Sequence, residues 1–151
     1  MQYYFEQAQT PDQTQSQPPE QSDFGGRPFV VDVARAALSN SDFRSALWTG
    51  EHLQLTVMSI MQGDDVGLEI HPHLDQMLYV VDGTGLVQMG DNRDDLYFEQ
   101  PVFEGSAIFV PANTWHNLTN TGESNLVLYS VYAPPGHDFG TVHRTKADDV
   151  D

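Results

Sequence analysis

The most constraining feature of this 151-residue chain is a succession of short apolar runs with a turn between neighbouring runs. The runs are rich in Val, Leu, Ile, Tyr and Phe, which favour β-strands. The turns consist mainly of Gly, Asp, Asn and Pro, as in QGDD, VDGTG and TNTGESN. No long helical period interrupts the pattern, which predicts an all-β sandwich or barrel. The expected strands are Phe43–Trp48, His52–Met61, Gly67–His71, Gln76–Val81, Leu86–Met89, Leu96–Phe98, Ala107–Val110, Trp115–Thr119 and Asn125–Tyr132.

The N-terminal part of the chain has a different composition. Gln, Pro, Ser and Asp dominate it, and such a segment cannot bury enough apolar area to offset the entropy lost on ordering. We therefore expect a disordered Gln/Pro-rich tail over residues 1–27, one barrel over 28–136 and a C-terminal extension over 137–151. At the start of the barrel, Phe29–Val33 is expected to be a strand and Ala34–Leu38 at most a short helix.

The charge balance is strongly acidic, with 22 Asp and Glu against 6 Lys and Arg and a formal net charge of -16. Such a surface repels phosphate backbones and anionic lipids, so no nucleic-acid or membrane partner is expected. The chain has no Cys, which excludes disulfides and thiolate metal sites. Because Met1–Gln7 lacks the features of a signal peptide and no apolar run approaches the roughly 20 residues that span a bilayer, we expect a cytoplasmic location.

Two separated segments carry polar residues at fixed spacings, Gly63-x5-Glu69-x-His71-x4-Gln76-x6-Gly83 and Gly105-x5-Pro111-x-Asn113-x2-His116-x3-Asn120. In order and spacing they resemble the two motifs of the cupin family, G-x5-H-x-H-x(3,4)-E-x6-G and G-x5-P-x-G-x2-H-x3-N. Three identities differ, because Glu69, Gln76 and Asn113 replace a His, a Glu and a Gly. The stretches FRSALWTG and LYSVYAPP also resemble a bacterial single-domain subfamily that is loosely labelled mannose-6-phosphate isomerase-like. The resemblance implies a jelly-roll, or double-stranded β-helix, barrel.

The resemblance also implies one divalent metal ion per chain, held by Glu69, His71, Gln76 and His116. Strand geometry agrees, since residues two apart share a face and Glu69 therefore projects with His71. Their oxygen and nitrogen donors suit Zn, Fe, Mn, Ni or Co. The usual family set of three histidines and one carboxylate becomes two histidines, one carboxylate and one amide, with the same single negative charge. Glutamine at this position also occurs in cupins that open unsaturated uronates.

Two alternatives to this ligand set remain at the level of sequence. A literal His-x-His pairs His71 with His73, and the ligands are then His71, His73, Gln76 and His116. The count from Gly63 favours Glu69, because His73 stands one residue too close to Gln76. In the other alternative, the same polar residues form a hydrogen-bonded barrel lining without a metal ion.

The candidate catalytic residues are Glu69, His73 and Arg44. His73 follows Pro72 in a turn, at the rim of the barrel, where it is either a bystander or a proton shuttle. Arg44 either binds a substrate carboxylate or phosphate through two hydrogen bonds or forms a surface salt bridge. We also expect His137 to be a surface residue.

Several aromatic and strand positions are assigned by their phase. Tyr132 belongs to the core or lines the site, whereas Tyr79 is out of phase with Gln76 and points away from the metal. The polar-containing set Gln54, Thr56 and Met58 and the apolar set Leu53, Leu55 and Val57 occupy opposite faces of one strand, and the sequence leaves open which faces inward.

The leading functional hypothesis is a metal-dependent isomerase or rearrangement enzyme that acts on a small polar substrate, a sugar or sugar acid. An Fe(II)-dependent dioxygenase and a non-catalytic small-molecule-binding cupin are the alternatives. By family analogy we also expect a homodimer, with Phe29–Val33 and His52–Met61 as candidate interface elements.

Overall fold

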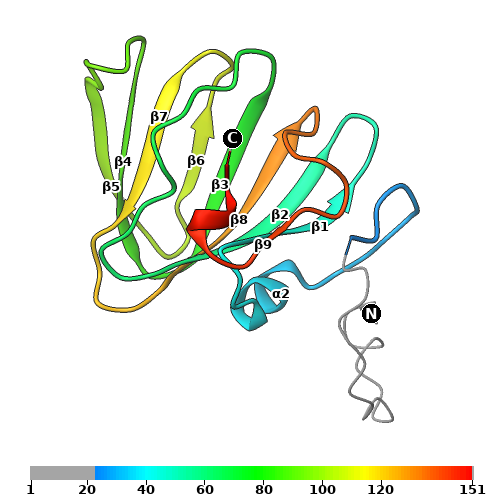
Figure 1. Cartoon of the computed structure of the whole chain (residues 1–151). Coiled ribbons are helices and arrows are strands. Elements are labelled where there is room, and N and C mark those ends of the chain that lie inside the picture. The colour runs from blue at the N-terminus through cyan, green and yellow to red at the C-terminus, as the bar shows by residue number, and fades with distance from the viewer. Residues whose placement is uncertain (1–22, 151) are drawn as a thin grey trace.

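Two antiparallel sheets face each other in the computed structural model, which describes residues 23–150 (Figure 1). The larger sheet has the strand order β6-β3-β8-β2-β1-β9 and the smaller one β5-β4-β7. This jelly-roll-like sandwich confirms the all-β prediction. The strands are β1 (Arg44–Thr49), β2 (Gln54–Ile60), β3 (Asp75–Asp82), β4 (Thr84–Gly90), β5 (Phe98–Phe103), β6 (Ala107–Val110), β7 (Trp115–Asn120), β8 (Leu126–Ala133) and β9 (Val142–His143).

The core lies between the sheets and follows the two-residue period of the strands. Along β3 and β7 buried and partly exposed residues alternate, so one face of each strand supplies the core. On β2 the inward face carries Gln54, Thr56 and Met58, which answers the question that the sequence left open. Val57, on the outer face of β2, packs instead with Ala37 and Val127 in a second, smaller cluster.

The helix α2 (Val33–Ser39) covers the outer face of the larger sheet, where it contacts β8, β2 and β3. Asp32 caps it by accepting a hydrogen bond from the backbone N–H of Arg35. The short helix is therefore confirmed. The strand predicted over Phe29–Val33 is wrong, because Val33 already begins the helix and Phe29 stacks on Phe24 with ring centroids 5.0 Å apart.

The strand predicted over Gly67–His71 is also wrong. This segment contacts β7 through two isolated bridges, Asp65 with Thr119 and Glu69 with His116, which are four positions apart on this segment and three positions apart on β7. Between the bridges, the side-chain oxygen of Asn117 accepts the N–H of Gly67 at 2.9 Å and takes the place of a backbone carbonyl. The extra residue makes a bulge, and bulges commonly redirect a side chain next to a functional site.

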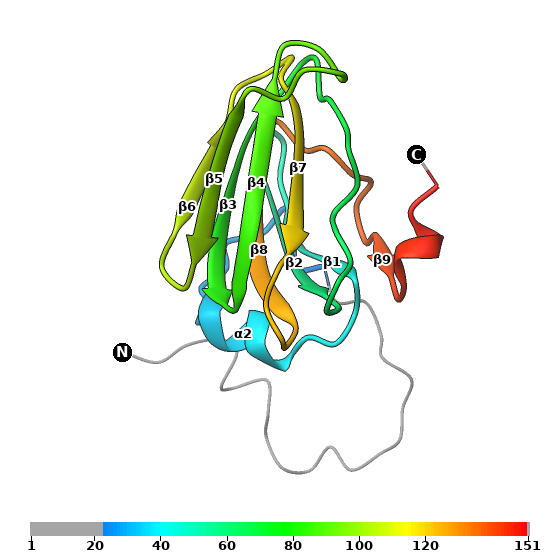
Figure 2. The same cartoon turned by 90° about the vertical axis from the view of Figure 1, so that its left-hand side faces the viewer.

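The two ends of the described chain attach to the same strand, β1. Asp23 accepts hydrogen bonds from the backbone of Thr49 at 3.0 Å and of Gly140 at 2.9 Å. Residues 23–27 of the predicted tail thus lie against the barrel, whereas residues 1–22 lie outside the described part. In the C-terminal extension β9 pairs with β1. Figure 2 shows the extension on the side of the sandwich away from the edge strands β5 and β6.

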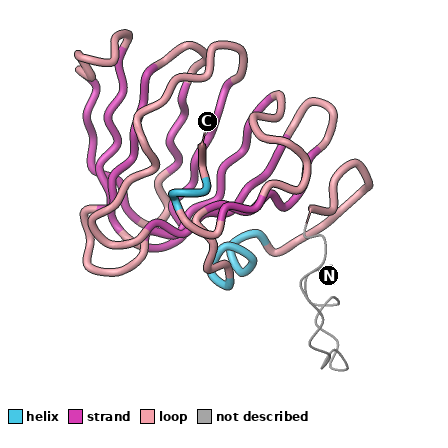
Figure 3. The backbone as a smooth tube through the Cα atoms, in the orientation of Figure 1, coloured by secondary structure: helices cyan, strands magenta, loops and turns pink. Residues whose placement is uncertain are grey.

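The remaining C-terminal residues form a 3-10 turn, η1 (Lys146–Asp148), which follows β9 after two residues (Figure 3). Lys146 forms ion pairs with Asp64 and Asp65, in the loop that leads to the first motif. The extension is therefore attached at two places, to β1 through β9 and to the loop before the first motif through Lys146. Of the helical segments within residues 23–150, none has the length and apolar character needed to cross a bilayer.

Candidate metal centre

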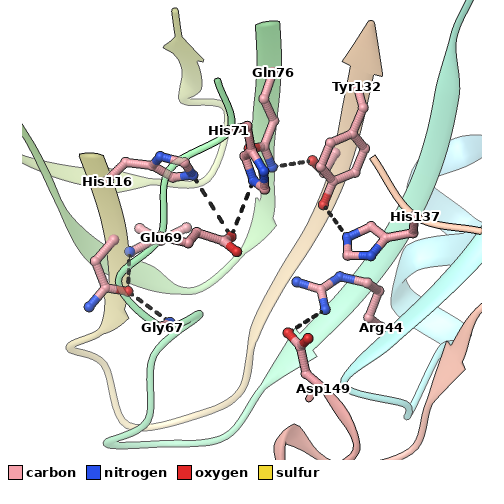
Figure 4. Close-up of polar contacts among 12 residues, drawn as sticks. Arg44, Gly67, Glu69, His71, Gln76, His116, Tyr132, His137 and Asp149 are labelled. Atoms are coloured by element: carbon pink, nitrogen blue, oxygen red, sulfur yellow. Dashed lines mark hydrogen bonds and ion pairs between the residues drawn. The ribbon is translucent and has the colours of Figure 1, made fainter. Parts of the chain in front are cut away.

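Three side chains with metal-ligating atoms meet at one end of the space between the sheets: Glu69, His71 and His116 (Figure 4). Glu69 and His116 pair through their backbones, with N–H to O distances of 3.0 and 2.9 Å, so they are cross-strand neighbours. The Glu69 Oε2 atom lies 3.5 Å from His71 Nε2 and 3.8 Å from His116 Nε2. These distances exceed that of a good hydrogen bond and leave room for an ion between the atoms.

The turn before β7 positions His71, because the His71 carbonyl accepts a hydrogen bond from the backbone N–H of Asn113 at 2.8 Å. Asn113 has φ 64°, and among residues 23–150 it is the one non-glycine residue with a positive φ. The family motif has Gly here because the left-handed conformation costs other residues about 1–2 kcal/mol, and Asn tolerates it best. The departure from the motif therefore preserves the backbone shape.

Gln76 approaches from the larger sheet, where β3 aligns it with Tyr132 of β8 and Val110 of β6. Its Nε2 donates a hydrogen bond of 2.9 Å to the Ser130 hydroxyl. This bond fixes the orientation of the amide, so that Oε1 is the atom left for another partner. The side chain is 5 % exposed, and Oε1 is buried without a hydrogen bond.

The hydrogen-bond inventory of these residues fits a cation. His71 Nε2, His116 Nε2 and Gln76 Oε1 are all buried without a partner, and each such atom costs about 1–3 kcal/mol. His116 Nδ1 must carry its proton, because it donates to the Thr114 carbonyl at 2.9 Å. The Nε2 lone pair of the neutral ring is then available. A divalent ion beside Glu69 would give all three atoms a partner, so the residues present suit a metal site.

The electrostatics suit a cation as well. Burial raises the pKa of Glu69, but the contact with His71 and the charges of His71, His116 and Arg44 outweigh it, so the pKa falls below its usual value. Burial lowers the pKa of His116. At neutral pH the site thus presents an ionised carboxylate and a deprotonated imidazole, the forms that bind metal ions.

The surroundings of the cluster differ on its two sides. Beneath Glu69, Gln76 and His116 lies a cavity of about 10 Å³, lined mostly by apolar core side chains. It has room for about one water molecule. On the opposite side a pocket of about 170 Å³ opens to the surface between Val66–Glu69 and the C-terminal residues Lys146 and Asp149. A small molecule would reach Glu69 by this route.

A second set of polar side chains lies beside the cluster and includes Arg44, Asp149, Tyr132 and His137. The sequence did not predict that they lie together. Arg44 is not a surface salt bridge: it is 1 % exposed, and its Nη1 donates to Asp149 Oδ2 at 2.8 Å. His137 is not a simple surface residue either, since its Nε2 lies 3.3 Å from the Tyr132 hydroxyl. Burial, with help from the charge of Arg44, lowers the pKa of His137 to about 4. Figure 4 shows Arg44, Tyr132 and His137 on the side of Glu69 away from His116.

The structure separates the remaining candidates. His73 is exposed in the turn at residues 72–73 and is not among the clustered ligands, so the set His71, His73, Gln76 and His116 is not assembled. Tyr79 points to the outer face of its sheet, where it stacks on Tyr129 with ring centroids 5.0 Å apart. Tyr132 is 1 % exposed and lies edge-on to His71, with a ring separation of 6.1 Å. Strand phase alone distinguishes Tyr132 from Tyr129, but nothing local in the sequence marks His137.

Two antiparallel sheets that enclose a possible His/Glu metal site define a metal-site jelly-roll protein. Residues 56–132 match the family model described as Cupin domain, and the chain belongs to the cupin family. It is 57% identical over 128 residues to the uncharacterized protein YrkC of Bacillus subtilis (strain 168), which covers 85% of this chain and 69% of that protein. It is 35% identical over 115 residues to the uncharacterized protein L612 of Acanthamoeba polyphaga mimivirus, covering 76% and 70%.

A solved structure shows the same fold at high identity. The crystal structure of BH2720 from Bacillus halodurans superposes with a TM-score of 0.83 and 59% sequence identity. The superposition covers 84% of this chain and 96% of that one. The single cupin domain predicted from the two motifs is therefore confirmed.

Proposed function

We propose that this chain is a metal-dependent enzyme that isomerises or rearranges a small polar molecule, a sugar or sugar acid. The observation that carries the proposal is the convergence of three buried, unpaired acceptor atoms beside an ionised Glu69. Such an arrangement is costly in a protein that binds nothing there. A cation accounts for all of these atoms together.

In this proposal Glu69, His71, Gln76 and His116 hold one divalent ion. When bound, such an ion withdraws electrons from a substrate oxygen. The chain supplies one negative ligand, so the site keeps a net positive charge for that oxygen. Gln76 is the weakest ligand of the four, and the Ser130 hydroxyl orients it. A substrate oxygen can displace it more readily than it can displace an imidazole or a carboxylate.

Isomerisation also requires a group that holds and releases a proton, and Tyr132 with His137 suits this role. Burial raises the pKa of Tyr132, so its hydroxyl keeps the proton at neutral pH. His137, with a pKa of about 4, is neutral and can accept the hydrogen bond from that hydroxyl. We assign proton transfer to this pair and to Glu69, because His73 is exposed and has no contact with the cluster.

One observation favours a second candidate function. Glu69, His71 and His116 form a two-histidine, one-carboxylate set, the ligand combination of many Fe(II) oxygenases. Gln76 would occupy a further position and leave fewer for substrate and dioxygen. Oxygen consumption by the Fe(II)-loaded protein with a diol or diketone would favour this candidate. Its absence, together with substrate-dependent isomerisation, would favour the first.

The decisive experiment on the site is elemental analysis of protein purified without chelators. We expect about one divalent ion per chain in the parent and a strong reduction in Glu69→Ala and His116→Ala. His73→Ala is the matched control, because it removes a nearby exposed imidazole, and its metal content should equal that of the parent. Parental metal content in Glu69→Ala would overturn this ligand set.

The reaction class needs its own experiment. The metal-loaded protein is incubated in D₂O with a panel of sugars and sugar acids, and NMR follows deuterium entry at the carbon beside the carbonyl. We expect exchange with at least one sugar acid and a large loss of exchange in Tyr132→Phe at unchanged metal content. Metal-loaded parent protein that exchanges no member of the panel would count against isomerisation.

The homodimer and the cytoplasmic location implied by the sequence remain proposals. The predicted interface element His52–Met61 contains β2, which is already paired with β8 and β1, so only its outer surface can take part. Light scattering coupled to size-exclusion chromatography tests the dimer, and a monomer mass would refute it.

A further inference from the structure

Arg44 is a buried cation beside Tyr132 and near the Glu69 cluster. It lies on the inner face of β1, 1 % exposed, and its charge is near enough to lower the pKa of Glu69. Its Nη1 contacts Asp149 Oδ2 at 2.8 Å and His143 Nδ1 at 3.1 Å. Its Nε is buried without a hydrogen-bond partner. A guanidinium so deeply buried requires a counter-charge, and here a single carboxylate of the C-terminal segment supplies one.

A second buried polar atom lies on the same inner face. Thr56 Oγ1 makes no hydrogen bond of good geometry, although it lies close enough to the Tyr132 hydroxyl to affect the pKa of Tyr132. Thr56 pairs with Ala46 on β1, two residues from Arg44, so both side chains point to the inner face of the sheet. Arg44 Nε and Thr56 Oγ1 are separate from the three unpaired atoms beside Glu69. They offer a donor and a hydroxyl to a polar ligand group on the Arg44 side.

We propose that Arg44 binds the carboxylate of the substrate and that Asp149 occupies this place while the site is free. This inference rests on the proposed function and selects, within it, a hydroxy acid over a neutral sugar. The substrate carboxylate replaces the Asp149 carboxylate at Arg44, and a hydroxyl or carbonyl oxygen of the same molecule faces Glu69, His71 and His116. A carboxylate with two free oxygens can engage two N–H groups of the guanidinium at once, and the Nε–H, on the side away from Nη1, has no partner.

The attachment of the C-terminal segment fits this exchange. Lys146 holds the segment at Asp64 and Asp65, next to Val66, which lines the pocket beside Glu69. Asp149 comes three residues later, at the end of η1, and with Lys146 it also lines that pocket. Asp149 is thus part of the wall of the entrance. The exchange moves the Asp149 carboxylate, while the ion pairs of Lys146 can remain.

The test uses three small probes that share a carbon skeleton: glycerate, glycerol and glycerol 3-phosphate. Each is titrated into metal-free and zinc-loaded protein, and NMR follows the Arg44 Nε–H signal. We expect glycerate to shift this signal in both forms, and glycerol to leave it in place. Asp149→Asn removes the competing charge in a side chain of nearly the same shape and should tighten glycerate binding about tenfold. Arg44→Gln, whose glycerate affinity is measured by titration calorimetry because it lacks the Arg44 signal, should weaken binding by at least the same factor.

Matched controls keep the result specific. Asp138→Asn removes an exposed carboxylate from the same extension and should leave glycerate affinity unchanged. Amide exchange of the residues after Lys146 should accelerate in the parent when glycerate saturates, because Asp149 has left Arg44. Equal glycerate affinity in the parent and Asp149→Asn would overturn the exchange. A stronger Arg44 response to glycerol 3-phosphate than to glycerate would overturn the carboxylate assignment.

The two proposals fail separately in this design. If the parent takes up no metal but glycerate still shifts Arg44 in the metal-free protein, the proposed chemistry is wrong and the anion site stands. If the parent loads zinc normally while glycerate binding ignores both Arg44→Gln and Asp149→Asn, the metal site stands and the anion site is wrong. Should Arg44→Gln fail to fold, the Asp149→Asn result alone decides the exchange.

Discussion

Replacing His116 by Asn should change the stability of the metal-loaded protein much more than that of the metal-free protein. The Asn amide can still donate to the Thr114 carbonyl, the bond that His116 Nδ1 makes at 2.9 Å, but the metal-facing Nε2 is gone. In the metal-free protein the unpaired Nε2 acceptor is exchanged for the Asn Oδ1 acceptor, so this exchange changes stability little. Removing part of a buried ring costs about 1–2 kcal/mol. We therefore expect a loss of about 1–2 kcal/mol in the metal-free protein.

With metal present the loss is larger. At a free ion concentration of about 100 times Kd, binding stabilises the folded parent by about 2.7 kcal/mol. Loss of one of four ligands should weaken binding at least about 100-fold, since even partners of the ligands are commonly worth about 10–100-fold. The variant then gains only about 0.4 kcal/mol under the same conditions. The difference of about 2.3 kcal/mol corresponds to roughly 5–9 °C in Tm for a domain of this size.

Calorimetry of the parent, His116→Asn and the His73→Ala control, each with and without zinc, measures this difference. The control should show the full metal-dependent rise in Tm, because His73 is exposed and outside the cluster. An equal rise in parent and His116→Asn would mean that the ion binds elsewhere. A large loss of stability in the metal-free variant would mean that Nε2 has a partner in the free protein, contrary to the reasoning above.

Three further predictions follow from single residues. Asn113→Ala should lower the free energy of unfolding by about 1 kcal/mol relative to Asn113→Gly, because φ is 64° there, and denaturant titration measures it. His137 has a pKa of about 4 in the folded protein against an ordinary 6.5, so the unfolded chain takes up its proton first as the pH falls. The parent should therefore lose up to about 3 kcal/mol of stability between pH 6.5 and pH 4 through this residue. His137→Gln should not show that part of the loss in acid titrations. Gln76→Glu adds a second carboxylate and should tighten metal binding at least about tenfold in chelator competition; unchanged affinity would remove Gln76 from the ligand set.

The sequence predicted that Glu69, His71 and His116 lie together, because the information needed was local. The two-residue spacing predicted that Glu69 projects with His71, and the motif spacing placed His116 after a turn of defined shape. The expected strand at Gly67–His71 was wrong for an equally local reason, since the Asn117 side chain intercepts the N–H of Gly67. No strand pattern reveals which polar side chain will replace a backbone carbonyl. Glu69 and His116 are still paired across this irregularity.

The positions of Arg44, His137 and Asp149 could not be predicted in this way. Arg44 and Asp149 are 105 residues apart, and the segment after Pro134 has no apolar period that would fix its path. We expected His137 at the surface because it lies in the polar segment after the barrel strands. It is partly buried because the Gln54 side chain binds its backbone N–H and C=O. Asp149 follows β9, a two-residue strand paired with β1 that is too short to leave a pattern in the sequence.

This division between local and distant contacts corresponds to a division in local stability. The metal cluster lies on backbone-paired segments above the apolar core, and opening it requires breaking contacts between the two sheets. Asp149 lies at the end of η1, in a segment attached by the two-residue strand β9, by the ion pairs of Lys146 and by the contact of Asp149 with Arg44. Segments with few buried contacts open at a small fraction of the global unfolding free energy. The fold therefore places Glu69, His71 and His116, the proposed metal ligands, around the backbone pairing of Glu69 with His116. It places the carboxylate that contacts Arg44 on a surface segment, as the proposed exchange with an acidic substrate requires.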